Sequence, residues 1–275
     1  MSISKSLRIA AATAAVATLA LAGCSSSAST EEEAGGLTLA DVQEAGVLVV
    51  GTEGTYSPFS FHADGGTGEL TGYDVEVITA VAEELGVEVQ FEETQWDAIF
   101  AGLDSGRWDV IANQVSINPE RSERYLFSTP YTYSPGVLIV PTDSDIQSFD
   151  DLEGATSAQS LTSNWADVAT ENGATVEGVE GFAQAVELLR TGRVDATIND
   201  RLTFLDYQQS QGGGDIGVDI VAETDDVSES AVTLRQGSED LQAAIDEALA
   251  TLAADGTLAE ISDRYFGEDV SVPQS

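Results

Sequence analysis

The sequence predicts an α/β fold, because short apolar strands alternate with amphipathic helices along the chain. Residues 47–51 are apolar and end in glycine, which is typical of a parallel strand buried on both faces. Residues 73–85 carry apolar side chains at helical spacing, and Gly86 is expected to end that helix. A helix–turn–strand element then occurs twice with the same internal spacing.

The start of the chain is expected to be a signal peptide, residues 1–23. It has a basic head and an apolar run, residues 9–21, that is too short to span a bilayer. The run ends in Leu-Ala-Gly-Cys24, which resembles the lipobox of bacterial lipoproteins, so Cys24 is expected to carry a lipid anchor. Residues 24–44, small and acidic at first, are expected to form a flexible tether between this anchor and the fold.

Further elements continue the alternation of strand and helix. Residues 87–91 are expected to form the next strand and residues 96–103 the next helix. Near the end of the chain, an apolar stripe over residues 241–252 predicts a longer helix, which Gly256 is expected to end.

The composition excludes several classes of function. The 275 residues include 48 Asp and Glu against 10 Lys and Arg, a net charge of −38 that repels nucleic-acid phosphates. The chain has a single cysteine and a single histidine, His62, which disfavours an internal disulfide, a metal centre and a Ser-His-Asp hydrolase. We therefore expect no metal, no cofactor, no catalytic residue and no nucleic-acid partner.

The repeated element predicts two walls of one cleft. A Gly-Arg-x-Asp turn begins at Gly106 and again 86 residues later at Gly192; each copy continues with a short strand-like run, Val-Ile-Ala or Ala-Thr-Ile, and then two polar residues. This turn is also a common helix-to-strand connection, so a chance match is the alternative. In open α/β sheets, ligands bind at the carboxyl ends of the strands. The repeat therefore predicts that polar residues from both copies face each other: Asn113 and Gln114 on one wall, Asn199 and Asp200 on the other.

The segment Gly-Tyr-Asp-Val-Glu-Val, residues 72–77, resembles the signature of family 3 extracellular solute-binding proteins, the polar-amino-acid receptors of ABC importers. The likeness runs from about residue 47 to 267. It implies a type II periplasmic-binding-protein-like clamp, two α/β lobes joined by two hinge strands. The expected boundaries are 45–133 plus 231–270 for lobe 1, 137–223 for lobe 2, and hinges near 134–136 and 225–230.

The resemblance also implies how a zwitterionic amino acid is held. Arg121 aligns with the family's carboxylate clamp, and a planar guanidinium can hold both carboxylate oxygens. Asp200 aligns with the acidic residue that receives the α-ammonium group; it is also placed to cap the helix that begins at Arg201. Ser116 and Thr162 are expected to give hydroxyl groups to the carboxylate.

Other site residues follow from the same alignment. Backbone N–H groups of Leu161, Thr162 and Ser163 are expected to assist with the carboxylate. Tyr56 and Trp96 align with aromatic walls on either side of the ligand stem. His62 is expected to lie in a loop near the rim of the cleft; the alternative is a pH-sensitive ligand contact.

The choice of amino acid depends on Glu53. Its position alone suggests a receptor for lysine, arginine or ornithine, but the surrounding sequence is most similar to the cystine-binding branch. Glu53 would then take the distal ammonium group of L-cystine, while Asn113, Gln114 or Asn164 assist the distal carboxylate. The alternatives are a receptor for glutamate, glutamine or a basic amino acid and, more remotely, a dehydratase-type enzyme on the same fold.

The expected role is therefore capture of a free amino acid, with L-cystine favoured, and its delivery to an ABC permease with its ATPase. The protein is expected to act as a monomer, lipid-anchored to the outer face of the cell membrane and touching the membrane only through that anchor.

Overall fold

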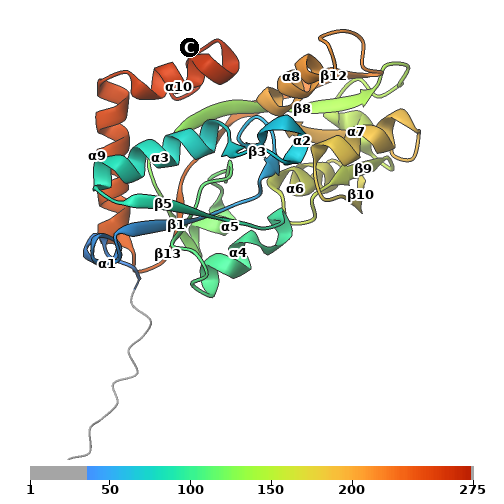
Figure 1. Ribbon diagram of the computed structural model, residues 1–275. Helices are drawn as coiled ribbons and strands as arrows, with labels where there is room; N and C mark the ends of the chain where they lie inside the picture. Colours follow the sequence, from blue (N-terminus) through green and yellow to red (C-terminus); the bar gives the residue numbers. More distant parts are fainter. Residues whose placement is uncertain (1–35, 274–275) are drawn as a thin grey trace, which may run out of the picture. The chain divides into compact units, whose positions relative to one another are not determined.

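A five-stranded sheet organises the first lobe (Figure 1). The computed structural model describes residues 36–273, so the expected signal peptide and Cys24 lie outside the described residues. Strand β1 is parallel to its neighbours β5 and β6, whereas β13 is antiparallel to both of its neighbours. In spatial order the strands are β5 (Glu88–Glu93), β1 (Val47–Thr52), β6 (Val110–Ile111), β13 (Thr233–Arg235) and β7 (Tyr125–Phe127).

Helices cover both faces of this sheet. Its larger apolar core joins the sheet to α1, α3, α9 and α10, and includes the fully buried Leu48 and Val50 of β1. Its smaller core lies under α4 and contains the buried Trp108. The helices are α1 (Leu39–Ala45), α3 (Tyr73–Leu85), α4 (Trp96–Asp104), α5 (Pro119–Ser122), α9 (Glu239–Ala254) and α10 (Thr257–Phe266).

A small three-stranded sheet and a short helix follow β1 and contribute to the site. They are β2 (Thr55–Tyr56), β3 (Ser60–His62), α2 (Ala63–Gly66) and β4 (Leu70–Thr71), with β3 in the middle of the sheet.

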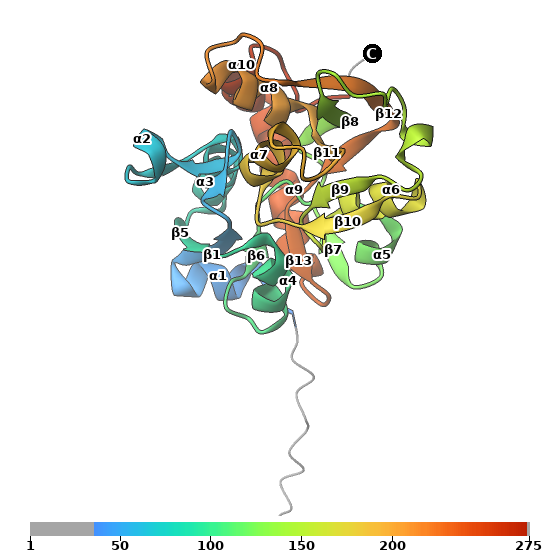
Figure 2. The ribbon, with the colours of Figure 1, turned by 90° about the vertical axis from the view of Figure 1, so that its right-hand side faces the viewer.

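The second lobe contains two sheets, seen from the side in Figure 2. One is antiparallel in the order β11–β8–β12, and the other is the parallel pair β9 and β10, linked to the first by a bridge between Ser157 and Ala196. Its elements are β8 (Thr132–Pro141), a short 3₁₀ helix (Phe149–Leu152), β9 (Thr156–Gln159), α6 (Asn164–Glu171), β10 (Thr175–Gly178), α7 (Phe182–Arg190), β11 (Thr197–Asp200), α8 (Arg201–Ser210) and β12 (Val218–Ser230).

The long strands β8 and β12 join the two lobes. They pair antiparallel from Thr132 opposite Ser230 to Pro141 opposite Val218, with an irregular register between Glu223 and Val227. Both segments expected to act as hinges lie on these strands, and a hinge motion there remains a prediction.

The two copies of the repeated element fold alike. Gly106 and Gly192 both have left-handed backbones, with φ of 70° and 65°. The following aspartates make the same contacts: Asp109 accepts a hydrogen bond from Val49 N at 2.9 Å, and Asp195 accepts one from Thr156 N at 2.8 Å. Asp109 therefore ties its strand to β1, and Asp195 ties its strand to β9.

Two expectations are wrong in detail. The tether does not extend to residue 44, because residues 39–45 form α1, whose Val42 is buried in the core and whose start is capped by Thr38. His62 does not lie in a loop, since it ends strand β3. Within residues 36–273, the structure contains no helix long and apolar enough to cross a membrane.

Candidate functional site

A cleft with about 490 Å³ of empty space lies between the lobes. Five of its lining residues come from the first lobe and were expected from the sequence: Glu53, Tyr56, Trp96, Asn113 and Gln114. The others come from the second lobe: Gln159, Ser160, Ser163, Asn164, Trp165, Gly181, Phe182 and Asn199. The cleft is therefore built mainly from strand ends and helix starts of both lobes.

Glu53 is the buried carboxylate of this cleft. Its Oε2 accepts a hydrogen bond from Asn113 Nδ2 at 2.7 Å, and its backbone N–H donates to Asn113 Oδ1 at 2.8 Å. The carboxylate also accepts from the backbone N–H of Trp96, at the start of α4. Burial nevertheless raises the pKa of Glu53 to about 7, because these donors only partly replace water.

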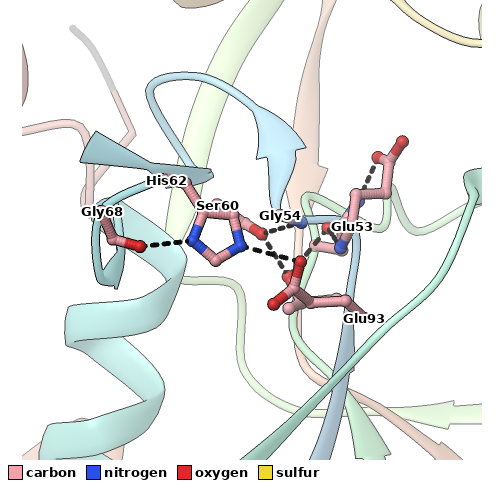
Figure 3. A network of polar contacts seen from close by, with 8 residues as sticks. Glu53, Gly54, Ser60, His62, Gly68 and Glu93 are labelled. Atoms are coloured by element: carbon pink, nitrogen blue, oxygen red, sulfur yellow. Dashed lines mark hydrogen bonds and ion pairs between the residues drawn. The ribbon is translucent and has the colours of Figure 1, made fainter. Parts of the chain in front are cut away.

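Figure 3 shows how the loop that carries Glu53 is held. Ser60 Oγ accepts from Gly54 N at 2.9 Å, and His62 contacts Gly68 O and Glu93 Oε2, both at 2.9 Å. Gly54 has φ of 71°, a left-handed conformation that favours glycine, and a Cβ there would also displace the Glu93 carboxylate. Because both ring nitrogens of His62 are engaged within the first lobe, the histidine supports the loop.

Arg121 is buried without an ion pair among the described residues. Its Nη1 donates to Ser116 O at 3.0 Å and its Nη2 to Thr162 O at 3.3 Å. The guanidinium lies 5.3 Å from the ring centroids of both Trp96 and Phe100. Burial lowers the pKa of Arg121 to about 10. It lines a side cavity together with Asp97 and Thr162, and this cavity shares no lining residue with the main cleft.

Thr162 and Ser116, expected to bind a ligand carboxylate, are engaged with protein groups. Thr162 N and Oγ1 donate to Asp97 Oδ1 at 3.1 and 2.8 Å, a contact between the two lobes. Ser116 Oγ accepts from Ser228 Oγ at 2.8 Å. Leu161 is 62% exposed, and none of these three expected residues lines the main cleft.

Ser163 and Asn164 do line the cleft, at the start of α6. Ser163 caps that helix by accepting from Ala166 N at 3.2 Å. Gln159 and Ser160, which the sequence analysis missed, lie at the end of strand β9: Gln159 is its last residue and Ser160 follows it. The rule that identified Asn113 and Asn199, polar residues at the end of an apolar strand, could not find them, because β9 has the largely polar sequence Thr-Ser-Ala-Gln.

Asp200 caps α8, as one of the two sequence interpretations expected. Its Oδ1 accepts from Leu202 N at 2.8 Å and from Ser134 Oγ at 2.9 Å. The side chain is buried, and burial raises its pKa to about 6. It lies beside the cleft-lining Asn199, and its contact with a ligand remains a prediction.

Tyr56 links the two walls of the cleft. Its hydroxyl donates to Asn199 Oδ1 and accepts from Thr203 Oγ1, both at 3.1 Å. Nearby, Ser57 Oγ donates to Asp206 Oδ2 at 2.8 Å, also between lobes. With the Thr162 contact, these hydrogen bonds hold the lobes against each other.

Comparison with known proteins places this architecture in a family. The model of bacterial extracellular solute-binding proteins, family 3, matches residues 48–268. The L-cystine-binding protein TcyA of Bacillus subtilis is 51% identical over 84% of this chain and 85% of its own. The L-cystine-binding protein TcyJ of Escherichia coli K12 is 40% identical over 84% of this chain and 86% of its own.

Solved structures agree with this. The L-cystine solute receptor of Neisseria gonorrhoeae, unliganded and open, is 44% identical and has a TM-score of 0.58 over 86% of this chain and all of its own. An ancestral arginine-binding protein bound to arginine is only 34% identical, yet has a TM-score of 0.74 over 81% of this chain and 99% of its own. The chain belongs to the bacterial extracellular solute-binding proteins of family 3.

Proposed function

We propose that this protein is the substrate-binding component of an ABC importer, and that it captures L-cystine and delivers it to a membrane permease. The observation that carries the proposal is the buried pair of Glu53 and Asn113 in a polar interlobe cleft. The 51% and 40% identity to L-cystine-binding proteins supports the same ligand. These relatives are named as binding proteins, which favours capture over catalysis.

Arg121 is proposed to bind the α-carboxylate of the ligand. A buried guanidinium without an anionic partner among the described residues is costly, and a ligand carboxylate would supply that partner. The donors of Thr162, which hydrogen-bond the Asp97 carboxylate, have the geometry to bind a carboxylate of the ligand in its place. Asp200, from the second lobe, is proposed to take the α-ammonium group, so that the ligand favours the closed clamp.

Glu53 is proposed to take the distal ammonium group of L-cystine. Replacing Glu53 with glutamine keeps the shape and removes the charge, so it should weaken L-cystine binding much more than binding of a small neutral amino acid. Equal losses for both ligands would contradict this role. The same carboxylate also suits lysine or arginine, and a receptor for a basic amino acid is therefore the second candidate.

A lipid anchor at Cys24 is proposed to keep the receptor on the outer face of the cell membrane, as a monomer beside its permease and ATPase. The support is the signal-like segment that precedes Cys24. Replacement of Cys24 with serine should release the protein from the membrane fraction and abolish palmitate labelling. Unchanged fractionation and labelling would contradict the anchor.

A thermal-shift screen tests the ligand. The purified protein is heated with each of the twenty amino acids, L-cystine, ornithine or diaminopimelate. A ligand present at a hundredfold its Kd adds about 2.7 kcal/mol of stability, which is roughly 5–10 °C for a chain of this size. We expect the largest shift with L-cystine. A larger shift with arginine or glutamine would support a role as an amino-acid receptor but reject L-cystine as the ligand. No shift with any of these compounds would reject the proposed function.

A further inference from the structure

Two buried polar groups of cleft-lining residues have no hydrogen-bond partner. They are Gln114 Oε1, an acceptor, and Trp96 Nε1, a donor. An unpaired polar group that is buried costs free energy unless a ligand satisfies it. The cleft thus offers one unpaired group of each kind, which suits a zwitterionic ligand.

The orientation of the Gln114 amide is set by its neighbours. Gln114 Nε2 donates to Asp74 Oδ1 at 2.6 Å and to Thr132 Oγ1 at 3.0 Å, so both hydrogens of the amide are used. Turning the amide over would bring Oε1 against the Asp74 carboxylate. The sequence analysis named Gln114 as one of three residues that could donate to the distal carboxylate of the ligand. In this orientation Gln114 has no free hydrogen to donate, and its free atom is the acceptor Oε1.

The backbone of Gln114 is held by the same carboxylate. Asp74 Oδ2 accepts a hydrogen bond from Gln114 N at 2.8 Å. Gln114 has φ of 50° and is the one non-glycine residue with positive φ in the part of the chain that the structure describes. Strained backbone of this kind persists only where surrounding contacts fix it, and it is concentrated at functional sites.

Asp74 itself does not line the cleft. It is 1% exposed, in the first turn of α3, within the Gly72–Val77 motif noted in the sequence. Its two oxygens are directed at Gln114, one to the backbone and one to the side chain. The motif therefore connects a core helix to a ligand-facing residue.

We propose that Gln114 Oε1 accepts a hydrogen bond from an ammonium group of the bound amino acid, and that Asp74 is the positioning residue that aims it. This inference rests on the proposed function, because it requires an amino-acid ligand. It assigns Gln114 to the recognition of a primary ammonium group, and it gives the motif a role in specificity.

Three variants test the assignment, with Kd for L-cystine measured by calorimetry. Gln114→Met removes the acceptor and should weaken binding at least tenfold. Asp74→Asn supplies an amide donor to Oε1, so the Gln114 amide should turn its Nε2 toward the ligand, again with at least a tenfold loss. The exchange D74N/Q114E restores a carboxylate–amide pair with an acceptor facing the cleft, and should recover affinity to within threefold of wild type. Gln209→Met, at an exposed glutamine of α8, is the matched control and should change nothing.

A spectroscopic readout separates aiming from folding. The side-chain carbonyl carbon of Gln114, labelled with ¹³C and assigned by its loss in Gln114→Met, should shift when L-cystine is added to the wild-type protein. If Asp74→Asn fails to fold, the affinity of Gln114→Met and the ¹³C signal of the wild-type Gln114 still test the inference. An unmoved signal, or Gln114→Met binding within threefold of wild type, would overturn the inference while the wild-type protein still binds L-cystine. Failure of the wild type to bind any amino acid would instead overturn the proposed function.

Discussion

Replacement of Arg121 by methionine should separate the stability of the ligand-free protein from its affinity for ligand. Methionine keeps most of the length of the side chain and removes the charge. Arg121 is 8% exposed, and its guanidinium is stacked on Trp96 and Phe100 and donates to two backbone carbonyl groups. These contacts hold a cation that burial disfavours.

The opposing contributions in the ligand-free protein are of similar size. Burial lowers the pKa of Arg121 from 12.5 to about 10, a cost of about 3 kcal/mol for the charged form. The two hydrogen bonds from the charged guanidinium stabilise the folded protein by about 3–6 kcal/mol. The variant should therefore lose no more than about 3 kcal/mol of unfolding free energy, and its fold should persist.

Ligand affinity should fall much further. When a ligand carboxylate loses its buried charged partner, the binding free energy weakens by about 2–5 kcal/mol. This loss corresponds to a roughly 30- to 5,000-fold increase in Kd. Calorimetric titration with L-cystine measures this directly. Arg121→Lys, which keeps the charge without the planar guanidinium, is the control. Its Kd for L-cystine should lie between those of the wild type and Arg121→Met. Binding by Arg121→Met within threefold of wild type would refute the carboxylate assignment.

Three further predictions concern pH and packing. Affinity for L-cystine should rise with pH by up to about tenfold per pH unit and level off near pH 7. The reason is that the distal ammonium group pairs with ionised Glu53, whose pKa is about 7. Titrations from pH 5 to 8 in which the affinity does not change would contradict this. Stability of the ligand-free protein should fall between pH 5 and 7. Burial raises the pKa values of Glu53, Asp74 and Asp200, so the folded state binds more protons than the unfolded state there, and each group costs up to about 1.4 kcal/mol per pH unit; a melting temperature that rises over this range would show the sign to be wrong. Gly102→Ala should lose about 1–3 kcal/mol in denaturant unfolding, because its Cβ would overlap the Trp108 indole; an unchanged midpoint would mean that this core can relax.

The sequence predicted elements whose signals are local. The helix at 73–85 was predicted with its observed bounds, because its apolar spacing and the following Gly86 both lie in one short window. The repeated Gly-Arg-x-Asp element was predictable for the same reason, because its glycine turn and the strand that follows lie in one short window. The contacts of its two aspartates, with residues 60 and 39 positions away, were not predictable in this way. Helix α1 was missed because its seven residues expose most of their side chains and bury only Val42.

Seven of the twelve expected site residues line the main cleft, but the contacts that they make could not be predicted from the sequence. Glu53 and Asn113 were both expected in the cleft, yet their mutual hydrogen bonds depend on how strands 60 residues apart meet. The engagement of Thr162 with Asp97 depends on closure of one lobe on the other. The donor–acceptor sense of Gln114 depends on Asp74, a residue that sequence alone assigns to a helix of the core.

Titration of the purified protein with L-cystine, before and after addition of a reductant, tests the central claim most directly. The reductant converts L-cystine to L-cysteine, which lacks the second head that Glu53 is proposed to bind. It leaves the folded part unaffected, because the only cysteine of the chain is Cys24. We predict one binding site for L-cystine that is lost on reduction. Binding that survives reduction unchanged, or that is tighter for arginine, would contradict the account.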